Sequence, residues 1–315
     1  MVDDTAAQML TKIEPSRLSA NLFYLSKDPL PFRKLNYTLP GHRRSTLHEA
    51  DDFLLGELAS WGYETRSEGV RVQAYRCDDS KPKAQQYSRP DPGDPWYTAY
   101  NLYGKRAGTE NPDEVIVMCA HKDSQSWVES PGAYDNAVGT VALLEIARVL
   151  AGCSLSRSIW FLFCNEEHTP WTSVTAAQVA KARGDDIIAV FNTDSLGGKS
   201  RDDLEAGRRT NVTLYTTPEG KELADLMVHV NREYSIGLDQ SVHRRKQPGD
   251  DDGSFVKAGF PSAIVNVGSH PYSDPNYHAE GDVPELVDIP NVTLATRAIL
   301  AAVMSLDRGE LGEVI

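Results

Sequence analysis

Short apolar runs alternate with helical repeats over most of the chain. Runs typical of buried strands occur at 98–103, 114–119, 158–163, 187–192, 212–216 and 262–267. Helix-like stretches lie between them, at 138–150, 174–182, 221–234 and 292–306. Strands that alternate with helices favour an α/β layered sheet, in which ligands bind beyond the carboxyl ends of the strands. Candidate chemistry is therefore expected at those ends.

The first 60 residues have a different pattern, which predicts helices. Pro15 opens one helix that runs to about residue 25, and Thr46 with Glu49 forms a capping box ahead of another. Residues 63–66 and 70–75 predict a pair of strands, and the polar, proline-rich residues 77–95 predict a long surface loop. No abrupt change of composition marks a boundary. We therefore predict one domain over 1–315, with residues 1–60 as a helical N-terminal extension packed on it.

Composition and charge narrow the class of protein. The chain has 315 residues, of which 40% are apolar and 24% charged, enough for a sizeable core. Its 32 basic and 45 acidic residues give a net charge of −13. Proteins that bind nucleic acid or anionic membranes normally have the opposite balance. We expect neither partner, whereas an acidic chain of this kind can hold cations.

The cysteines and the N-terminus suggest a compartment. Four cysteines lie far apart without a CxxC pair, so free thiols are expected and a cysteine zinc site is not. The acidic start has no pattern of a signal peptide, and no run of about 18 apolar residues predicts a membrane span. These features predict a cytoplasmic protein, or a secreted one if a leader was removed.

Residues able to bind metal ions or move protons gather where the predicted strands end. After four of the strands, and before one helix, stand His121, Asp135, Glu166, Glu167, Asp194 and His278. Taken singly, Asp135 has the position of a helix cap, and Glu166 with Glu167 has the pattern of an exposed acidic pair. Together they occupy the same edge of one sheet. Two imidazoles and three carboxylates suit a pair of zinc ions.

Five short strings resemble those of metallopeptidase family 28, the di-zinc exopeptidases that include leucyl aminopeptidases and glutamate carboxypeptidases. The first ligand's string, His-x-Asp-Ser, is matched at 121–124, and the Gly-Ala-x-Asp string of the bridging carboxylate at 132–135. The Glu-Glu pair is matched at 166–167, Asn-x-Asp at 192–194 and Tyr-His at 277–278. The resemblance runs from about 97 to 307. It implies a three-layer sandwich with a central mixed, mostly parallel sheet flanked by helices, as in zinc exopeptidases and phosphorylase/hydrolase-like folds.

The resemblance also implies a role for each matched residue. Two zinc ions, or other dications such as Co²⁺ or Mn²⁺, would share the metal ligands His121, Asp135, Glu167, Asp194 and His278, with Asp135 bridging. Glu166 would be the general base, and Asp123 would orient His121. Asp282 is expected to act as Asp123 does. Tyr277 is the candidate for binding the oxyanion, and a cis peptide is expected after Asp135.

Two strings depart from the family pattern. Where the family has His in its Ser-Asp-His string, this chain has Asp252, which leaves the role of that position near the substrate open. The string at 167–171 also differs from the Gly-rich family version. Both departures lie where specificity pockets are built.

Three functions agree with the sequence. The first is a zinc aminopeptidase or related exopeptidase acting on peptides. The second is a glutaminyl-peptide cyclase with one zinc ion; such cyclases tend to have Trp where this chain has Tyr277. The third is a binding module without catalysis, although such descendants usually lose a ligand or the base, and neither is lost here.

Overall fold

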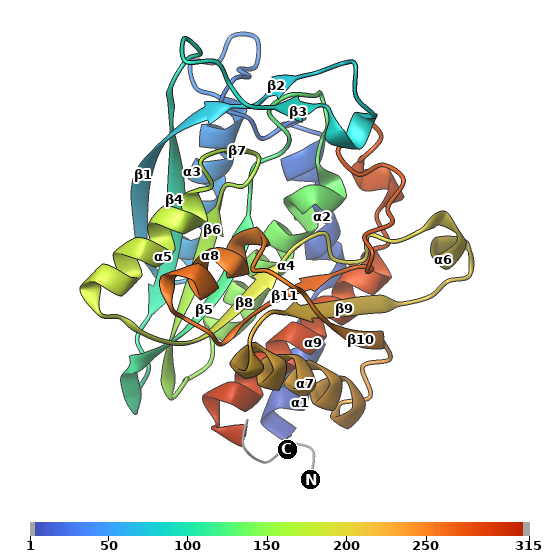
Figure 1. Cartoon of the computed structure of the whole chain (residues 1–315). Coiled ribbons are helices and arrows are strands. Elements are labelled where there is room, and N and C mark those ends of the chain that lie inside the picture. Colours follow the sequence, from blue (N-terminus) through green and yellow to red (C-terminus); the bar gives the residue numbers. More distant parts are fainter. Residues whose placement is uncertain (1–3, 311–315) are drawn as a thin grey trace.

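A nine-stranded mixed sheet forms the centre of the computed structural model, which describes residues 4–310 (Figure 1). In spatial order its strands are β10 (Asp239–Arg244), β9 (Thr210–Tyr215), β11 (Ala263–Val267), β8 (Asp186–Thr193), β5 (Asn111–His121), β6 (Arg157–Cys164), β4 (Tyr97–Arg106), β1 (Glu64–Ala74) and β7 (His168–Thr169). The central strands β11, β8, β5 and β6 are parallel, whereas β4, β1 and β7 are antiparallel. The predicted α/β fold with a mostly parallel core is therefore confirmed.

Helices cover both faces of the sheet and complete three layers. Alternate residues of β5 face opposite cores: Ile116 and Met118 pack in the larger one, Val117 and Cys119 in the smaller one. The larger core is covered by α1 (Asp4–Thr11), α2 (Pro15–Ser26), α3 (Thr46–Ser60), α4 (Val138–Leu150), α7 (Pro218–Glu233) and α9 (Ile289–Asp307). The smaller one is covered by α5 (Thr172–Arg183) and α8 (Asp250–Ala258), which lie on one side of the sheet in Figure 1. Short elements are α6 (Arg201–Glu205) and η3 (Pro284–Leu286).

The six predicted strands and four predicted helices of the central region are all present, with shifted ends. The strand pair predicted before them is wrong. Residues 64–74 form the single long strand β1, which pairs without a break along β4. Gly69 lies in the middle of this strand, opposite Tyr100. In the sequence alone, a glycine at this position suggests a turn.

The N-terminal helices form nearly as predicted. Helix α2 begins at Pro15, and α1 to α3 share a core with α4 and α9. The capping box at Thr46 is wrong by one residue, because Ser45 is the N-cap and accepts from the amide of His48. The Thr46 hydroxyl instead contacts the backbone of Lys34. Whether the chain is one domain with an extension stays a prediction.

The proline-rich segment after β1 is more ordered than a plain loop. It contains β2 (Arg76–Cys77), the helical turn η1 (Lys83–Gln85) and β3 (Tyr87–Ser88), and the two strands pair antiparallel. Because β1 pairs with β7 just before β2 begins, this segment starts beside β7, at the top of Figure 1.

All four cysteines are free thiols, and Cys77 is exposed whereas Cys119 and Cys164 are buried. Within residues 4–310, α9 alone has the length and hydropathy of a membrane span. Its apolar window is 78% buried inside the fold, as in the core helix of a globular protein.

Candidate metal centre

The carboxyl ends of three neighbouring parallel strands bring the predicted residues together. His121 is the last residue of β5, Asp194 follows β8 directly, and Glu166 and Glu167 come just after β6. Asp135 lies in the helical turn η2 (Ala133–Ala137) that precedes α4. Because parallel strands end at the same edge of a sheet, these side chains converge.

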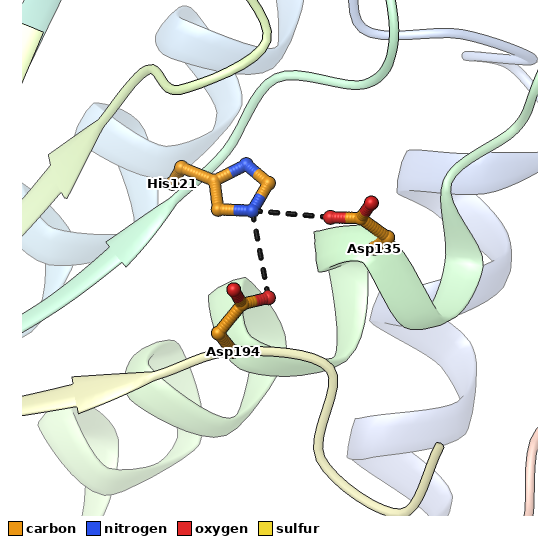
Figure 2. A group of neighbouring side chains, drawn as sticks. All are labelled: His121, Asp135 and Asp194. Atoms are coloured by element: carbon orange, nitrogen blue, oxygen red, sulfur yellow. Dashed lines mark ion pairs between the residues drawn. The ribbon is translucent and has the colours of Figure 1, made fainter. Parts of the chain in front are cut away.

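The first group joins His121, Asp135 and Asp194. The Nε2 atom of His121 lies 3.2 Å from Asp135 Oδ1 and 3.5 Å from Asp194 Oδ1. Figure 2 shows the imidazole between the two carboxylates, which come from η2 and from the end of β8. We call this set the His121 group.

The second group joins Asp135, Glu167 and His278. The Nε2 atom of His278 lies 3.0 Å from Asp135 Oδ2 and 3.6 Å from Glu167 Oε1. We call this set the His278 group. In each group the ligand atoms lie within 4.8 Å of one another, and Asp135 offers one oxygen to each group. The structure thus brings together all five residues predicted to be ligands.

The chemistry of the donors fits divalent cations. Imidazole and carboxylate are ligands of zinc, and four of the five residues are buried. A buried cluster with three carboxylates is costly unless cations balance it. In the protein alone the imidazoles supply that charge: burial lowers the pKa of His278, but Glu167 and Asp135 outweigh it and raise the pKa to about 11. Burial opposes ionisation of Asp135 too, yet its contacts with His121 and His278 hold its pKa below the usual range.

Asp123 supports more of the site than predicted. Its Oδ1 lies 3.4 Å from His121 Nδ1, an ionic contact rather than a well-formed hydrogen bond. The same carboxylate accepts hydrogen bonds of 2.9 Å from the backbone amides of Glu166 and Glu167. It also lies 2.8 Å from His168 Nδ1. One buried carboxylate therefore positions both the first imidazole and the acidic pair.

Asp282 acts on a backbone rather than on an imidazole. It accepts from the amides of Tyr134, at 2.7 Å, and Asp135, at 3.0 Å. It thereby fixes the turn that carries Asp135. This differs from the predicted role, which is to orient an imidazole as Asp123 does. The Asp135–Asn136 peptide bond is cis, as the resemblance implies.

Three further residues hold the site and have no signal in the short strings. Gln125 donates to Asp135 Oδ2 at 2.8 Å. Asn136 donates to the carbonyl of Thr193 at 2.8 Å and so ties η2 to the end of β8. The guanidinium of Arg33 is fully buried and donates to the carbonyl of Lys122, just after β5, and to that of Gly132, just before η2. In the sequence, Gln125 and Asn136 are marked only by their closeness to Asp123 and Asp135. No sequence feature points to Arg33.

A cavity of about 210 Å³ opens beside the His278 group. Glu166 lines it, and its Oε2 atom is buried with no hydrogen-bond partner among the described residues. Burial, followed by the charge of Asp251, raises the pKa of Glu166 well above its usual value. Tyr277 also lines the cavity and stacks on the ring of His278, with ring centroids 3.7 Å apart. Larger cavities beside α1 contain none of the predicted site residues.

The departure at Asp252 is explained by a nearby arginine. Asp252 is fully buried and forms an ion pair with Arg245. Arg245 also holds Asp250, with Nη1 2.6 Å from Oδ2, and Asp250 lines the cavity. The carboxylate at 252 therefore belongs to an ionic cluster behind the cavity wall.

Comparisons with known proteins agree with this geometry. The family model for Peptidase family M28 matches residues 101–303. Leucine aminopeptidase 1 of Sclerotinia sclerotiorum is 28% identical over 206 residues, which cover 62% of this chain and 53% of that protein. The chain thus spans about half the length of that relative.

Solved structures show the same fold at low identity. The LapA aminopeptidase of Legionella pneumophila has a TM-score of 0.70 at 18% identity, covering 97% of this chain and 76% of that one. A glutaminyl cyclase of Bacteroides thetaiotaomicron has a TM-score of 0.65 at 15% identity, covering 93% and 98%. The family match spans well over half of the sequence and includes all five residues of the metal groups, so the chain belongs to peptidase family M28.

Proposed function

We propose that the chain is a zinc-dependent exopeptidase that removes the N-terminal residue of peptides. The observation that carries this proposal is the pair of donor groups sharing Asp135. One zinc ion would be held by the His121 group and a second by the His278 group. When bound, zinc lowers the pKa of a coordinated water to about 7 and polarises the carbonyl that is attacked.

Glu166 is proposed as the general base. Its carboxylate lines the cavity, while its backbone amide is held by Asp123 at 2.9 Å. A carboxylate with a free, buried oxygen and a raised pKa can accept the proton of the attacking water. The same group then delivers that proton to the leaving amine.

Tyr277 is proposed to stabilise the oxyanion. Its ring stacks on that of His278, and Tyr277 lines the cavity, which supports this role. A phenol can donate one hydrogen bond to the oxygen that gains negative charge. The position of Tyr277 beside the His278 group supports this role, as the positions of the five donors support their roles as ligands.

The test uses Glu166→Gln with aminoacyl-4-nitroanilides. We expect kcat to fall about 10²- to 10⁴-fold, as for loss of a general base, while zinc content stays at two per chain. The matched control is Glu129→Gln, an exposed glutamate outside the cavity. Full activity in Glu166→Gln would exclude the base role.

Two further measurements separate the other functions. N-acetylated peptides should resist cleavage, because an aminopeptidase needs a free amine. Release of ammonia from a Gln-initiated peptide without cleavage would show a cyclase instead. Wild-type protein that takes up no zinc after chelation and dialysis would favour a binding module.

A further inference from the structure

Tyr272 contacts the segments that carry two of the five donor residues. It lies in the loop after β11, six residues before His278. Its ring meets the ring of Tyr277 edge-on, with centroids 4.9 Å apart and an angle of 71° between the planes. Tyr277 in turn stacks on the imidazole of His278, with centroids 3.7 Å apart and an angle of 26°. Three rings therefore form a row that ends at a proposed metal ligand.

The hydroxyl end of Tyr272 lies against the loop that follows Asp194. A Cβ atom placed on Gly198, four residues after Asp194, would overlap the phenol oxygen and lie 2.8 Å from Cζ. Gly198 is not among the glycines with a left-handed φ. Glycine is therefore needed at this position for space, because any side chain would displace the phenol.

Hydrogen bonds hold this loop in place behind the phenol. The backbone amides of Gly198 and Gly268 both donate to the carbonyl of Ser195, at 3.0 and 3.1 Å. The hydroxyl of Ser269 donates to the carbonyl of Gly198 at 2.9 Å. The loop after Asp194 is thus a fixed surface on which Tyr272 rests.

The ring of Tyr272, rather than its hydroxyl, makes the contacts that matter here. The oxygen is buried and has no well-formed hydrogen bond with any residue of 4–310, although Ser195 is close by. A buried hydroxyl without a partner adds no stabilising bond. Phenylalanine would supply the same ring contacts, whereas a smaller aliphatic side chain would not.

The imidazole of His278 needs support from packing. A metal-binding imidazole is usually oriented by a partner of its second ring nitrogen. No described residue pairs with Nδ1 of His278. The stacked ring of Tyr277 therefore has to fix the orientation, and Tyr277 depends on what lies behind it. In a close-packed interior, displacement of one ring is passed to the next.

We propose that Tyr272 is a positioning residue for His278: it rests on Gly198 and holds Tyr277 against the imidazole. The inference rests on the proposed function, because it concerns a residue assigned there as a zinc ligand. It also connects the two donor groups by a route other than the shared Asp135. A change in the loop after Asp194 reaches His278 through Tyr272.

The test measures zinc affinity in the background His121→Ala, in which the His278 group is the remaining site. Titration against a chelator compares Tyr272→Leu, Tyr272→Phe and Gly198→Ala. We expect affinity to fall about tenfold in Tyr272→Leu and in Gly198→Ala, and less than about twofold in Tyr272→Phe. An unchanged affinity in Tyr272→Leu, or an equal loss in Tyr272→Phe, would overturn the proposal.

A double variant tests whether Gly198 acts through Tyr272. Once Tyr272→Leu has removed the phenol, Gly198→Ala should cause no further loss of zinc affinity. Additive losses would contradict the proposed contact. The matched controls are Tyr234→Leu, a half-buried tyrosine at the end of α7, and Gly56→Ala, where a Cβ would have no atom within 4 Å. Both controls should leave the affinity unchanged.

Nuclear magnetic resonance of the metal-free protein separates this inference from the proposed function. The stacked ring of Tyr277 shields the imidazole protons of His278, whose signals are assigned by their loss in His278→Ala. These signals should move downfield in Tyr272→Leu and stay in place in Tyr272→Phe. If the wild-type protein binds no zinc, the proposed function fails, whereas the moved signals still support the positioning role. Signals that do not move in Tyr272→Leu would overturn it.

Discussion

The two donor groups share Asp135 but are held in different ways. His121 ends a central strand, and Asp123 stands behind its second ring nitrogen. His278 lies in the loop between β11 and η3 with a left-handed φ of 54°, and its Nδ1 has no hydrogen-bond partner within the described residues. Its ring is instead held by stacking on Tyr277. One ligand is positioned by the sheet and the other by packed rings on a loop.

This difference predicts unequal metal sites. A second partner on the imidazole fixes its orientation and strengthens it as a ligand. Asp123 lies 3.4 Å from the second ring nitrogen of His121, an ionic contact rather than a hydrogen bond, whereas no described residue pairs with that nitrogen of His278. We therefore expect the His121 group to hold its metal more tightly, and the His278 group, which faces the cavity, to exchange it.

Loss of the shared carboxylate should remove both sites at once. In Asp135→Ala we expect zinc to fall from the proposed two ions to fewer than one ion per chain. Activity should fall roughly 10³-fold or more, since metal catalysis is worth several kcal/mol and each 1.4 kcal/mol is about tenfold. Elemental analysis and nitroanilide kinetics measure this. Asp113→Ala, which alters an exposed aspartate at the start of β5, is the control. Retention of both ions would show that Asp135 bridges nothing.

Removal of each histidine should leave different residual sites. His278→Ala and His121→Ala are each expected to keep one zinc ion. The ion left in His278→Ala, at the His121 group, should bind about 10- to 100-fold more tightly than the ion left in His121→Ala, at the His278 group. Titration against a chelator gives both affinities. The reverse order would refute the comparison.

The support behind His121 can be weakened without removing a ligand. Asp123→Asn keeps the shape but removes the charge that faces His121 and His168. We expect metal affinity or activity to fall about 10- to 100-fold, with the loss concentrated in the His121 group. Zinc titration of the double variant with His278→Ala isolates that group. Unchanged affinity there would mean that the strand alone positions the imidazole.

Acid should weaken zinc binding. The raised pKa of His278, about 11, means that its ion pairs with Glu167 and Asp135 stabilise the metal-free protein fully below its ordinary pKa of about 6.5. That contribution is lost as pH rises toward 11. Zinc needs the neutral imidazole, so protons compete with it at low pH. The rise in melting temperature caused by zinc should therefore grow from pH 5 to pH 9. A rise that is constant with pH would contradict the proton competition.

The sequence predicts the central fold well because buried parallel strands appear as plain apolar runs. Most residues of β5 and β6 are buried, and their apolar runs predict both strands. Strand β10 lies at the sheet edge with no buried residue, and α8 begins with three aspartates and a glycine. Neither segment has a periodic pattern of apolar residues, so the sequence predicts neither element.

The candidate site, like the fold, is predicted only in part from the sequence. The five donors stand in short strings, three at or just after strand ends and two outside strand ends, and the structure brings all of them together. Gln125, Asn136 and Tyr87 come from the loop after β5, from η2 and from β3, and these segments meet only in the folded chain. Tyr87 lies 191 positions before His278, so no local pattern connects the two.

The buried guanidinium of Arg33 has a practical consequence for dividing the chain. Arg33 lies outside the region that matches the family model and donates to the carbonyls of Lys122 and Gly132. Asp51, also outside that region, forms an ion pair with Lys122. A fragment trimmed to residues 101–303 would contain all five donor residues. It would lack Arg33 and Asp51, whose contacts support the segments beside them. We therefore expect a fragment that binds metal to need residues before 101, where the family match begins.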